Sequence, residues 1–264
     1  MGTNLFHIGL SIAQKNFKKL VRENLLGLLW LFLTPLLYSI FFLLVKQSVS
    51  GDQISSVELK RSAFNAFIGL LLIQLWFQSI QDTSNVVRKN RNTLRSLDVS
   101  VFPFIFAIFI ETTIYLLIRA FIISAALFIF NVTPTILPST LGVYIPLAFF
   151  CFISTSLFLG LLLTPWATLF NDVRSFLNSS LMPTALLSPI FYFPVNESGN
   201  FLFWVNHLLP FATIQAVISD CVFQDSTIYL FPLALWAIIS LIGLFVFCYL
   251  IRQQTPILLE RLGN

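Results

Sequence analysis

Charged side chains are the scarcest feature of this sequence. Only 10% of the residues are charged, whereas 57% are hydrophobic and the mean hydropathy is +0.89. A typical soluble domain carries about 25% charged residues. A chain of 264 residues with this composition has too little polar surface for a water-soluble fold. The composition therefore predicts an integral membrane protein.

Several catalytic and ligand-binding motifs are also missing. No glycine begins the G-x-x-x-x-G-K-[ST] loop that holds nucleotide phosphates, so the chain cannot hydrolyse ATP by that mechanism. The only histidines, His7 and His207, have no neighbouring thiols or carboxylates that would complete a metal site. We therefore expect no catalytic residue, no metal and no bound cofactor. The three scattered cysteines are typical of small core side chains rather than of a disulfide framework.

Long apolar stretches dominate what is present. A helix needs about 20 apolar residues to cross the hydrocarbon core. Six stretches qualify: 25–45, 62–81, 101–130, 141–170, 176–195 and 227–251. A seventh, 199–223, is interrupted by Pro210 and flanked by acidic residues, which favours a re-entrant helical hairpin. The prediction is an all-α integral membrane protein with six spans and one domain over residues 1–264.

The basic residues orient these spans. If both termini are cytoplasmic, eleven of the 15 Lys and Arg residues fall on the inner side and three on the outer side. This is the bias expected of a membrane protein, and it accounts for the net charge of +4 without nucleic acid. The first span follows four basic residues and precedes no small-residue cleavage site, so we expect it to be retained.

Residues 3–22 predict an amphipathic helix before the first span. Apolar residues recur every three or four positions, as on one helix face: Phe6, Leu10, Ala13, Phe17 and Leu20. Basic residues lie on the other faces. The favoured interpretation is a helix in the cytoplasmic membrane surface, and the alternative is a basic flank that only sets orientation.

Two charges fall inside the third predicted span. Glu111 and Arg119 are eight residues apart, about 80° around a helix. Intramembrane charges are candidates for function, such as contact with a solute or a neighbouring subunit. The interpretation we favour is structural: Arg119 snorkels to the outer interface and Glu111 bonds a polar neighbour.

Two cytoplasmic connections carry further charge. The loop 81–100 holds four basic residues and is either a solvated, orientation-setting loop or a docking surface for a partner. The turn N-D-V-R at 171–174 joins the fourth and fifth spans. We expect Asp172 to be the N-cap of the following helix and Arg174 to satisfy the positive-inside bias.

Three stretches resemble one known family. The segment 22–37 has a basic residue, then L-G-x-x-W and a proline, at Arg22, Leu26, Gly27, Trp30 and Pro35. The D-V-R turn at 172–174 is followed by S-P-I-x-Y at 188–192, and "HLLPFATIQAV" contains Pro210. In order and spacing these are similar to the polysaccharide-exporting permeases of ABC-2 type transporters, over residues of about 20 to 250.

The resemblance implies a homodimeric permease of the bacterial cytoplasmic membrane, paired with two copies of an ATPase that holds ATP and Mg²⁺. The implied cargo is a lipid-linked polysaccharide such as O-antigen; alternatives are teichoic acid, a drug, an ion-driven carrier or a membrane assembly factor. Aromatic rings suit a sugar path, with candidates Phe191, Tyr192 and Trp204. The residues expected to couple to the ATPase are Lys15, Lys18, Lys19, Arg88, Lys89, Arg91, Asp172 and Arg174.

Overall fold

The computed structural model of the chain describes residues 2–23, 27–50, 56–97, 100–129, 138–197, 199–224 and 228–261. These residues form helices joined by turns and irregular segments and include no strand, so the predicted all-α class is confirmed for them. The helices are α1 (Gly2–Glu23), α2 (Gly27–Ser50), α3 (Ser56–Ser84), α4 (Val86–Lys89), α5 (Arg91–Leu97), α6 (Phe102–Ile129), α7 (Pro138–Leu169), α8 (Asp172–Leu187), α9 (Phe201–Leu208), α10 (Pro210–Ser219) and α11 (Leu230–Arg261).

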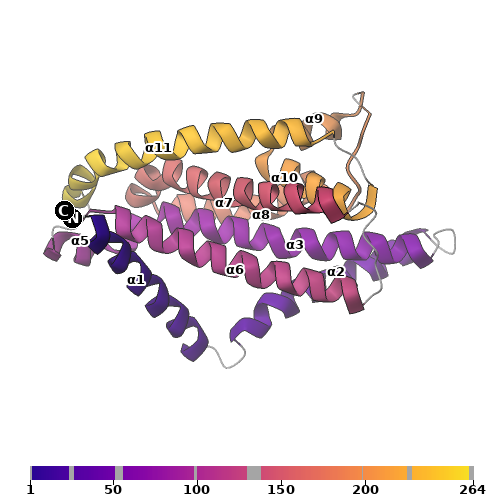
Figure 1. Cartoon of the computed structure of the whole chain (residues 1–264), viewed down its shortest axis with the longest axis horizontal. Coiled ribbons are helices and arrows are strands. Elements are labelled where there is room, and N and C mark those ends of the chain that lie inside the picture. Colours follow the sequence, from indigo (N-terminus) through magenta and orange to yellow (C-terminus); the bar gives the residue numbers. More distant parts are fainter. Residues whose placement is uncertain are drawn as a thin grey trace.

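The long helices form a bundle around α3 (Figure 1). Helix α3 packs against α2, α6, α7 and α8, and α11 lies along α7. Both chain ends, together with α5, lie at one end of the bundle, which we call the terminal end. The segment that joins α8 to α9 lies at the opposite, distal end.

Among the described residues, four helical stretches are long and apolar enough to cross a membrane, and they lie within α3, α6, α7 and α11. Taken together, α9 and α10 would make a fifth candidate. Within α2, the stretch Leu33–Ser48 is a shorter apolar helix, and residues 25–26 of the predicted first span lie outside the described residues. Helix α11 continues ten residues past the predicted boundary at 251, to Arg261.

The predicted span 176–195 differs most from the structure. Helix α8 begins at Asp172 and ends at Leu187, so only 12 of those 20 residues are helical. Ser188 has an extended backbone, with φ −84° and ψ 153°, because the ring of Pro189 disfavours a helical residue before it. The described residues between α8 and α9, 188–197 and 199–200, are not helical.

The predicted hairpin 199–223 is a bent helix pair. Helices α9 and α10 meet at Leu209–Pro210 with an angle of 105°, and a π-helical turn, Asp220–Gln224, extends α10. Pro210 begins α10, where a missing backbone N–H costs no helical hydrogen bond. Every residue of α10 is buried.

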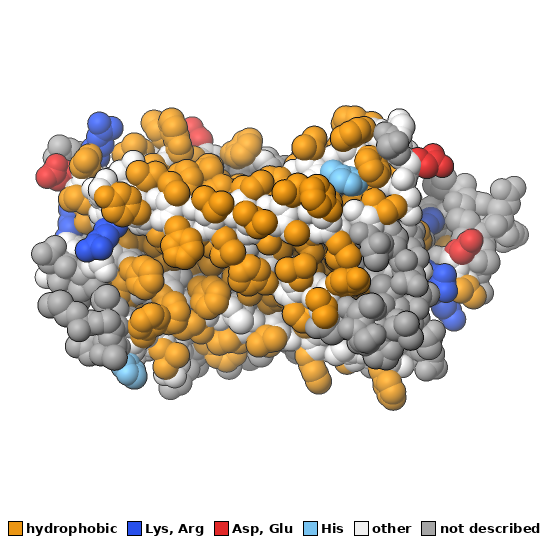
Figure 2. Space-filling model, turned by 45° about the horizontal axis from the view of Figure 1, so that its top comes forward, with side chains coloured by type: hydrophobic (Ala, Val, Ile, Leu, Met, Phe, Trp, Pro, Cys, Tyr) orange, Lys and Arg blue, Asp and Glu red, His pale blue; other side chains and the backbone are white. Residues whose placement is uncertain are grey.

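The surface and the interior of the bundle are inverted relative to a soluble protein. Hydrophobic side chains cover the middle of the face in Figure 2, and charged side chains lie at its two ends. Exposed apolar residues of α11 include Phe231, Ile242, Phe245 and Tyr249. Polar residues are buried between helices instead: Ser79 bonds Ser156, Trp76 donates to Thr155 and Ser240 donates to Ser154. This pattern fits a bundle whose surroundings are lipid.

Helix α1 matches the amphipathic helix predicted over 3–22, but its inward face is different. It packs on α6 through Gly9, where an added Cβ would lie 2.9 Å from the ring of Phe106. Ala13 is buried and Phe6 packs edge-on against Phe106, whereas Leu10 is exposed. Part of the predicted apolar face therefore packs against α6, and the rest is exposed on the surface of the molecule.

Candidate functional site: a basic pocket at the terminal end

Two connections far apart in the sequence meet at the terminal end and form a pocket of about 530 Å³. The first is the region from the end of α3 to α5, which corresponds to the predicted loop 81–100. The second is the turn between α7 and α8. We call this the basic pocket, and its lining residues are Gln81, Asp82, Asn85, Arg88, Lys89, Phe170, Asn171 and Arg174.

Side-chain contacts join the two connections. The guanidinium of Arg88 donates to the side-chain carbonyl of Asn171, across 83 residues of sequence. The Nε2 of Gln81 donates to Oδ1 of Asn178 on α8, with 2.8 Å between the atoms. These contacts hold the start of α8 against the end of α3.

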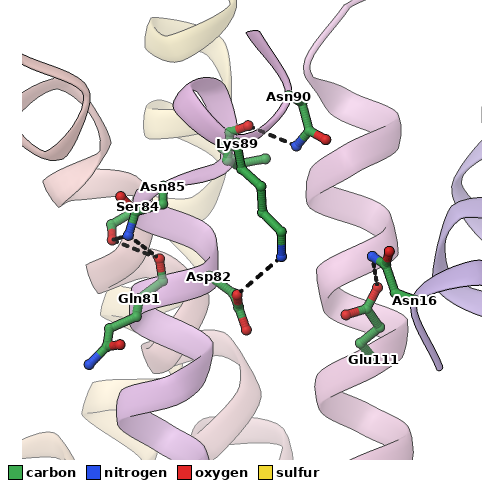
Figure 3. Close-up of polar contacts among 9 residues, drawn as sticks. Asn16, Gln81, Asp82, Ser84, Asn85, Lys89, Asn90 and Glu111 are labelled. Carbon is green, nitrogen blue, oxygen red and sulfur yellow. Dashed lines mark hydrogen bonds and ion pairs between the residues drawn. The ribbon is translucent and has the colours of Figure 1, made fainter. Parts of the chain in front are cut away.

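The charge of the pocket is positive. Three of its lining side chains are cationic, namely Arg88, Lys89 and Arg174, and one is a carboxylate, Asp82. The Lys89 ammonium lies 3.5 Å from Oδ1 of Asp82 (Figure 3). Lys89 is largely exposed and Asp82 is partly exposed, so this ion pair contributes only about 0–1 kcal/mol to stability. The excess positive charge is therefore available to an anionic partner surface.

The basic residues are presented by a small apolar cluster beneath them. Val86 and Val87 are fully buried, and Leu94 of α5 is nearly so. Their neighbours in the cluster come from α6 and the residue before it, from α7 and from α11: Val101, Phe104, Ile105, Leu161, Ile251 and Leu258. The guanidinium of Arg95 donates to the carbonyl of Leu259, which ties α5 to α11. The described part of 81–100 is therefore a folded surface anchored by its apolar residues, and its four basic side chains are exposed on that surface.

The prediction that Asp172 is the N-cap of the following helix is wrong. Helix α8 takes Asn171 as its N-cap residue, and Asp172 is its first helical residue. No side chain caps the helix, and Asn171 accepts from Arg88 instead. Asp172 still places a negative charge in the first turn, where it interacts favourably with the positive end of the helix dipole.

Helix α1 reaches the third predicted span through a polar contact. The Nδ2 of Asn16 donates to Oε1 of Glu111, with 2.8 Å between them, and Figure 3 shows the two side chains meeting from separate helices. The expectation that Glu111 bonds a polar neighbour is confirmed. Lys15 is exposed on the same helix, and the side chains of Lys18 and Lys19 lie outside the described residues.

Arg119 does not snorkel. Its side chain is 1% exposed, and its guanidinium donates to the backbone carbonyl of Leu71 on α3. The expected position at the outer interface is therefore wrong, because α6 turns this residue toward the central helix. The guanidinium satisfies a carbonyl there and fixes α6 against α3.

The aromatic candidates for a cargo path do not converge on one surface. Phe191 packs against Phe42 of α2, with 5.0 Å between ring centroids. The hydroxyl of Tyr192 lies 2.5 Å from the carbonyl of Leu187 and 3.0 Å from Oδ1 of Asn206. Trp204 is exposed on α9.

Sequence analysis missed several polar residues that organise the bundle. The Nδ2 of buried Asn65 lies 2.9–3.1 Å from the carbonyls of Pro189, Ile190 and Tyr192, just where α8 has ended. Asn171, Asp82 and Gln81 of the basic pocket were also not singled out. Polar residues recur every three or four positions at Gln74, Gln78, Gln81 and Asn85, which is a sequence signal for Gln81 but not for Asn65 or Asn171.

Comparison with known proteins agrees with this architecture. The sequence model of one family, described as ABC-2 type transporter, matches residues 10–223. No curated protein matches the chain significantly. The matched region covers most of the 264 residues and includes the basic pocket, α1 from residue 10 and the bent helix pair. The chain therefore belongs to the ABC-2 type transporter family, and it is a multi-pass membrane component, or permease, of an ABC exporter.

Proposed function

We propose that this chain is the permease of an exporter that moves a lipid-linked polysaccharide, of the O-antigen kind, across the bacterial cytoplasmic membrane. Two copies of the permease pair with two copies of a separate ATPase, which binds ATP and Mg²⁺, while the permease holds no cofactor. The observation that carries the proposal is the basic pocket. It gathers two helix connections into one folded, positively charged surface at the end of the bundle where both termini lie.

The topology proposed is six spans with cytoplasmic termini, counting α2 and α8 as the first and fifth. The α9–α10 pair re-enters and returns to the distal end. Contacts between the two flanks of this segment support the return: the Tyr229 hydroxyl donates to the carbonyl of Val195, and the rings of Phe193 and Phe223 are 5.6 Å apart. A continuous crossing would separate these flanks by the thickness of a membrane.

The ATPase acts on the permease through the basic pocket. Closure of the ATPase pair displaces α4, α5 and the start of α8, and the Asn16–Glu111 contact relates α1 to α6. The bond from Arg95 to Leu259 passes the movement to α11. A conformational change of this kind requires that the ATPase bind the two states of the pocket with different affinity.

The polysaccharide passes between the two permease copies. Phe191, Tyr192 and Trp204 are proposed to contact the sugar near the distal end, where an aromatic ring offers a flat apolar face. Trp204, at 56% exposed, is the best placed of the three for such a contact.

The direct test is co-purification with an ATPase encoded beside this chain, followed by ATP-driven movement of polymer into vesicles. The proposal expects a stable complex, and it expects both ATP turnover and polymer uptake to depend on the permease. ATP turnover that is indifferent to the permease would refute the proposal. If the complex with the same ATPase instead takes up a teichoic acid or a drug, the chain is still an exporter permease, but the proposed polysaccharide cargo is wrong.

The docking surface is tested by charge reversal. We expect Arg88→Glu, Lys89→Glu and Arg91→Glu together to reduce ATPase co-purification at least tenfold, because the positive surface becomes negative. The matched control reverses Lys46, Lys60 and Arg61, which lie near the other end of α3. Equal retention of the ATPase by both triple variants would exclude this docking site.

An ion-driven carrier is the competing function, since Glu111 is a carboxyl group in a candidate span. It predicts transport without any ATPase and loss of transport in Glu111→Gln. The exporter predicts that Glu111→Gln keeps transport, because a glutamine still offers Asn16 an acceptor oxygen.

A further inference from the structure

From Ser62 onward, helix α3 is enclosed by its neighbours except along one polar strip. Between Ser62 and Val87, every residue of which is described, Gln78 is the only exposed side chain. Apart from Ala63, the half-buried positions in this range are also polar: Gln74, Gln81, Asp82 and Asn85. The open side of an apolar membrane helix thus carries amides and a carboxylate rather than leucines.

The geometry places these side chains together. At 100° per residue, Gln74, Gln78, Gln81 and Asp82 lie within an arc of about 100° and extend over about 12 Å of the helix axis. Gln81 is also a lining residue of the basic pocket. The strip therefore starts at the pocket and runs from there into the candidate span.

Helix α8 continues the strip beside α3. Ser175, Asn178 and Ser179 are exposed along its first two turns, where the exposed apolar side chain is Phe176. Asn178 is bonded to Gln81, so the polar residues of the two helices are adjacent rather than on opposite sides of the molecule. We call the residues Gln74, Gln78, Gln81, Asp82, Ser175, Asn178 and Ser179 the polar stripe.

Lipid is a poor neighbour for this surface. Exposed amide and hydroxyl groups have no hydrogen-bond partners in hydrocarbon, and polar side chains at membrane depth face the bundle interior or a water-filled cavity. The outer face of α11 shows the alternative, since Ile238, Ile242 and Phe245 are exposed and apolar. The two surfaces therefore face different surroundings.

We infer that the polar stripe lines a water-filled passage that begins at the basic pocket and carries a hydroxyl-rich cargo. Amide and hydroxyl groups exchange hydrogen bonds with sugar hydroxyls as readily as with water, so they hold such a cargo without trapping it. The nature of the cargo rests on the proposed function, whereas the presence of water rests on the polar stripe alone.

Thiol accessibility in the full chain tests the passage. Single variants Gln78→Cys, Asn178→Cys and Ser179→Cys are treated in inverted membrane vesicles with a charged, membrane-impermeant methanethiosulfonate reagent. The control is Phe245→Cys, which lies at a depth similar to that of Gln78. Ser79, next to Gln78, bonds Ser156 of α7, and Phe158 on the same part of α7 meets Gly243 of α11. The unaltered chain gives the background labelling: Cys151 and Cys221 are buried, and the half-buried Cys248 is present in every variant.

We expect the stripe variants to react at least tenfold faster than Phe245→Cys, and their modification by a bulky reagent to stop polymer transport. Rates as slow as that of Phe245→Cys would overturn the inference. Ser179→Cys retains the test if Gln78→Cys fails to fold. Co-purification with the ATPase is scored separately, so a failed exporter proposal and a failed passage give different results.

Discussion

Helices α3 and α11 show how differently two apolar helices of one chain can be used. Both qualify as membrane spans, with mean hydropathies of 1.6 and 2.5, yet 83% of the most apolar stretch of α3 is buried and only 17% of that of α11. From Ser62 onward, the one exposed side chain of α3 is the polar Gln78, whereas the exposed side chains in the middle of α11, such as Ile238, Ile242 and Phe245, are apolar. Exposure thus indicates water beside one helix and lipid beside the other.

The largest effect is expected where α3 packs closely against α7. A Cβ on Gly160 of α7 would lie 2.4 Å from Cβ of Thr83 and 3.0 Å from the carbonyl of Ile80. We expect Gly160→Leu to force α7 away from α3 and to lower the free energy of unfolding by about 3 kcal/mol. Thermal unfolding of the purified protein measures this. The control is Gly199→Leu, where a Cβ meets nothing within 4 Å, and an equal Tm in both variants would contradict the prediction.

The second prediction concerns the polar interior of α3. Asn65→Leu removes the amide that contacts the carbonyls of Pro189, Ile190 and Tyr192. We expect a loss of about 2 kcal/mol, because buried carbonyl groups are left without a donor. Gln78→Leu on the same helix should change stability by less than about 0.5 kcal/mol, since it is exposed. If the two variants unfold at the same temperature, buried and exposed amides of α3 do not differ as proposed.

The smallest effect is expected on α11. Phe245 is 78% exposed, so Phe245→Leu should leave the Tm unchanged in a lipid nanodisc. Phe245→Gln should lower stability by about 1 kcal/mol, because an amide then faces hydrocarbon without a partner. Identical melting of the leucine and glutamine variants would show that this face of α11 does not lie against lipid.

Sequence patterns predicted the helices better than their ends. The span 101–130 agrees with α6 within a residue at each end, because its apolar run has clear boundaries. The span 176–195 was placed too late, because hydropathy ignores the break that Pro189 imposes after Leu187 and the helical start at Asp172. Of the candidate docking residues, Arg88, Lys89 and Arg174 are gathered in the basic pocket, while Arg91 lies outside it on α5.

By itself, the sequence determined that this protein is surrounded by lipid and that it is helical. So few charges among so many apolar residues permit only a helical membrane chain, and the bias of Lys and Arg predicts its orientation. Only the tertiary structure decided which side of each helix is open. Arg88 meets Asn171, Arg119 turns inward to Leu71, and Gln78 stays exposed, because helix packing brings together residues that one-dimensional patterns leave far apart.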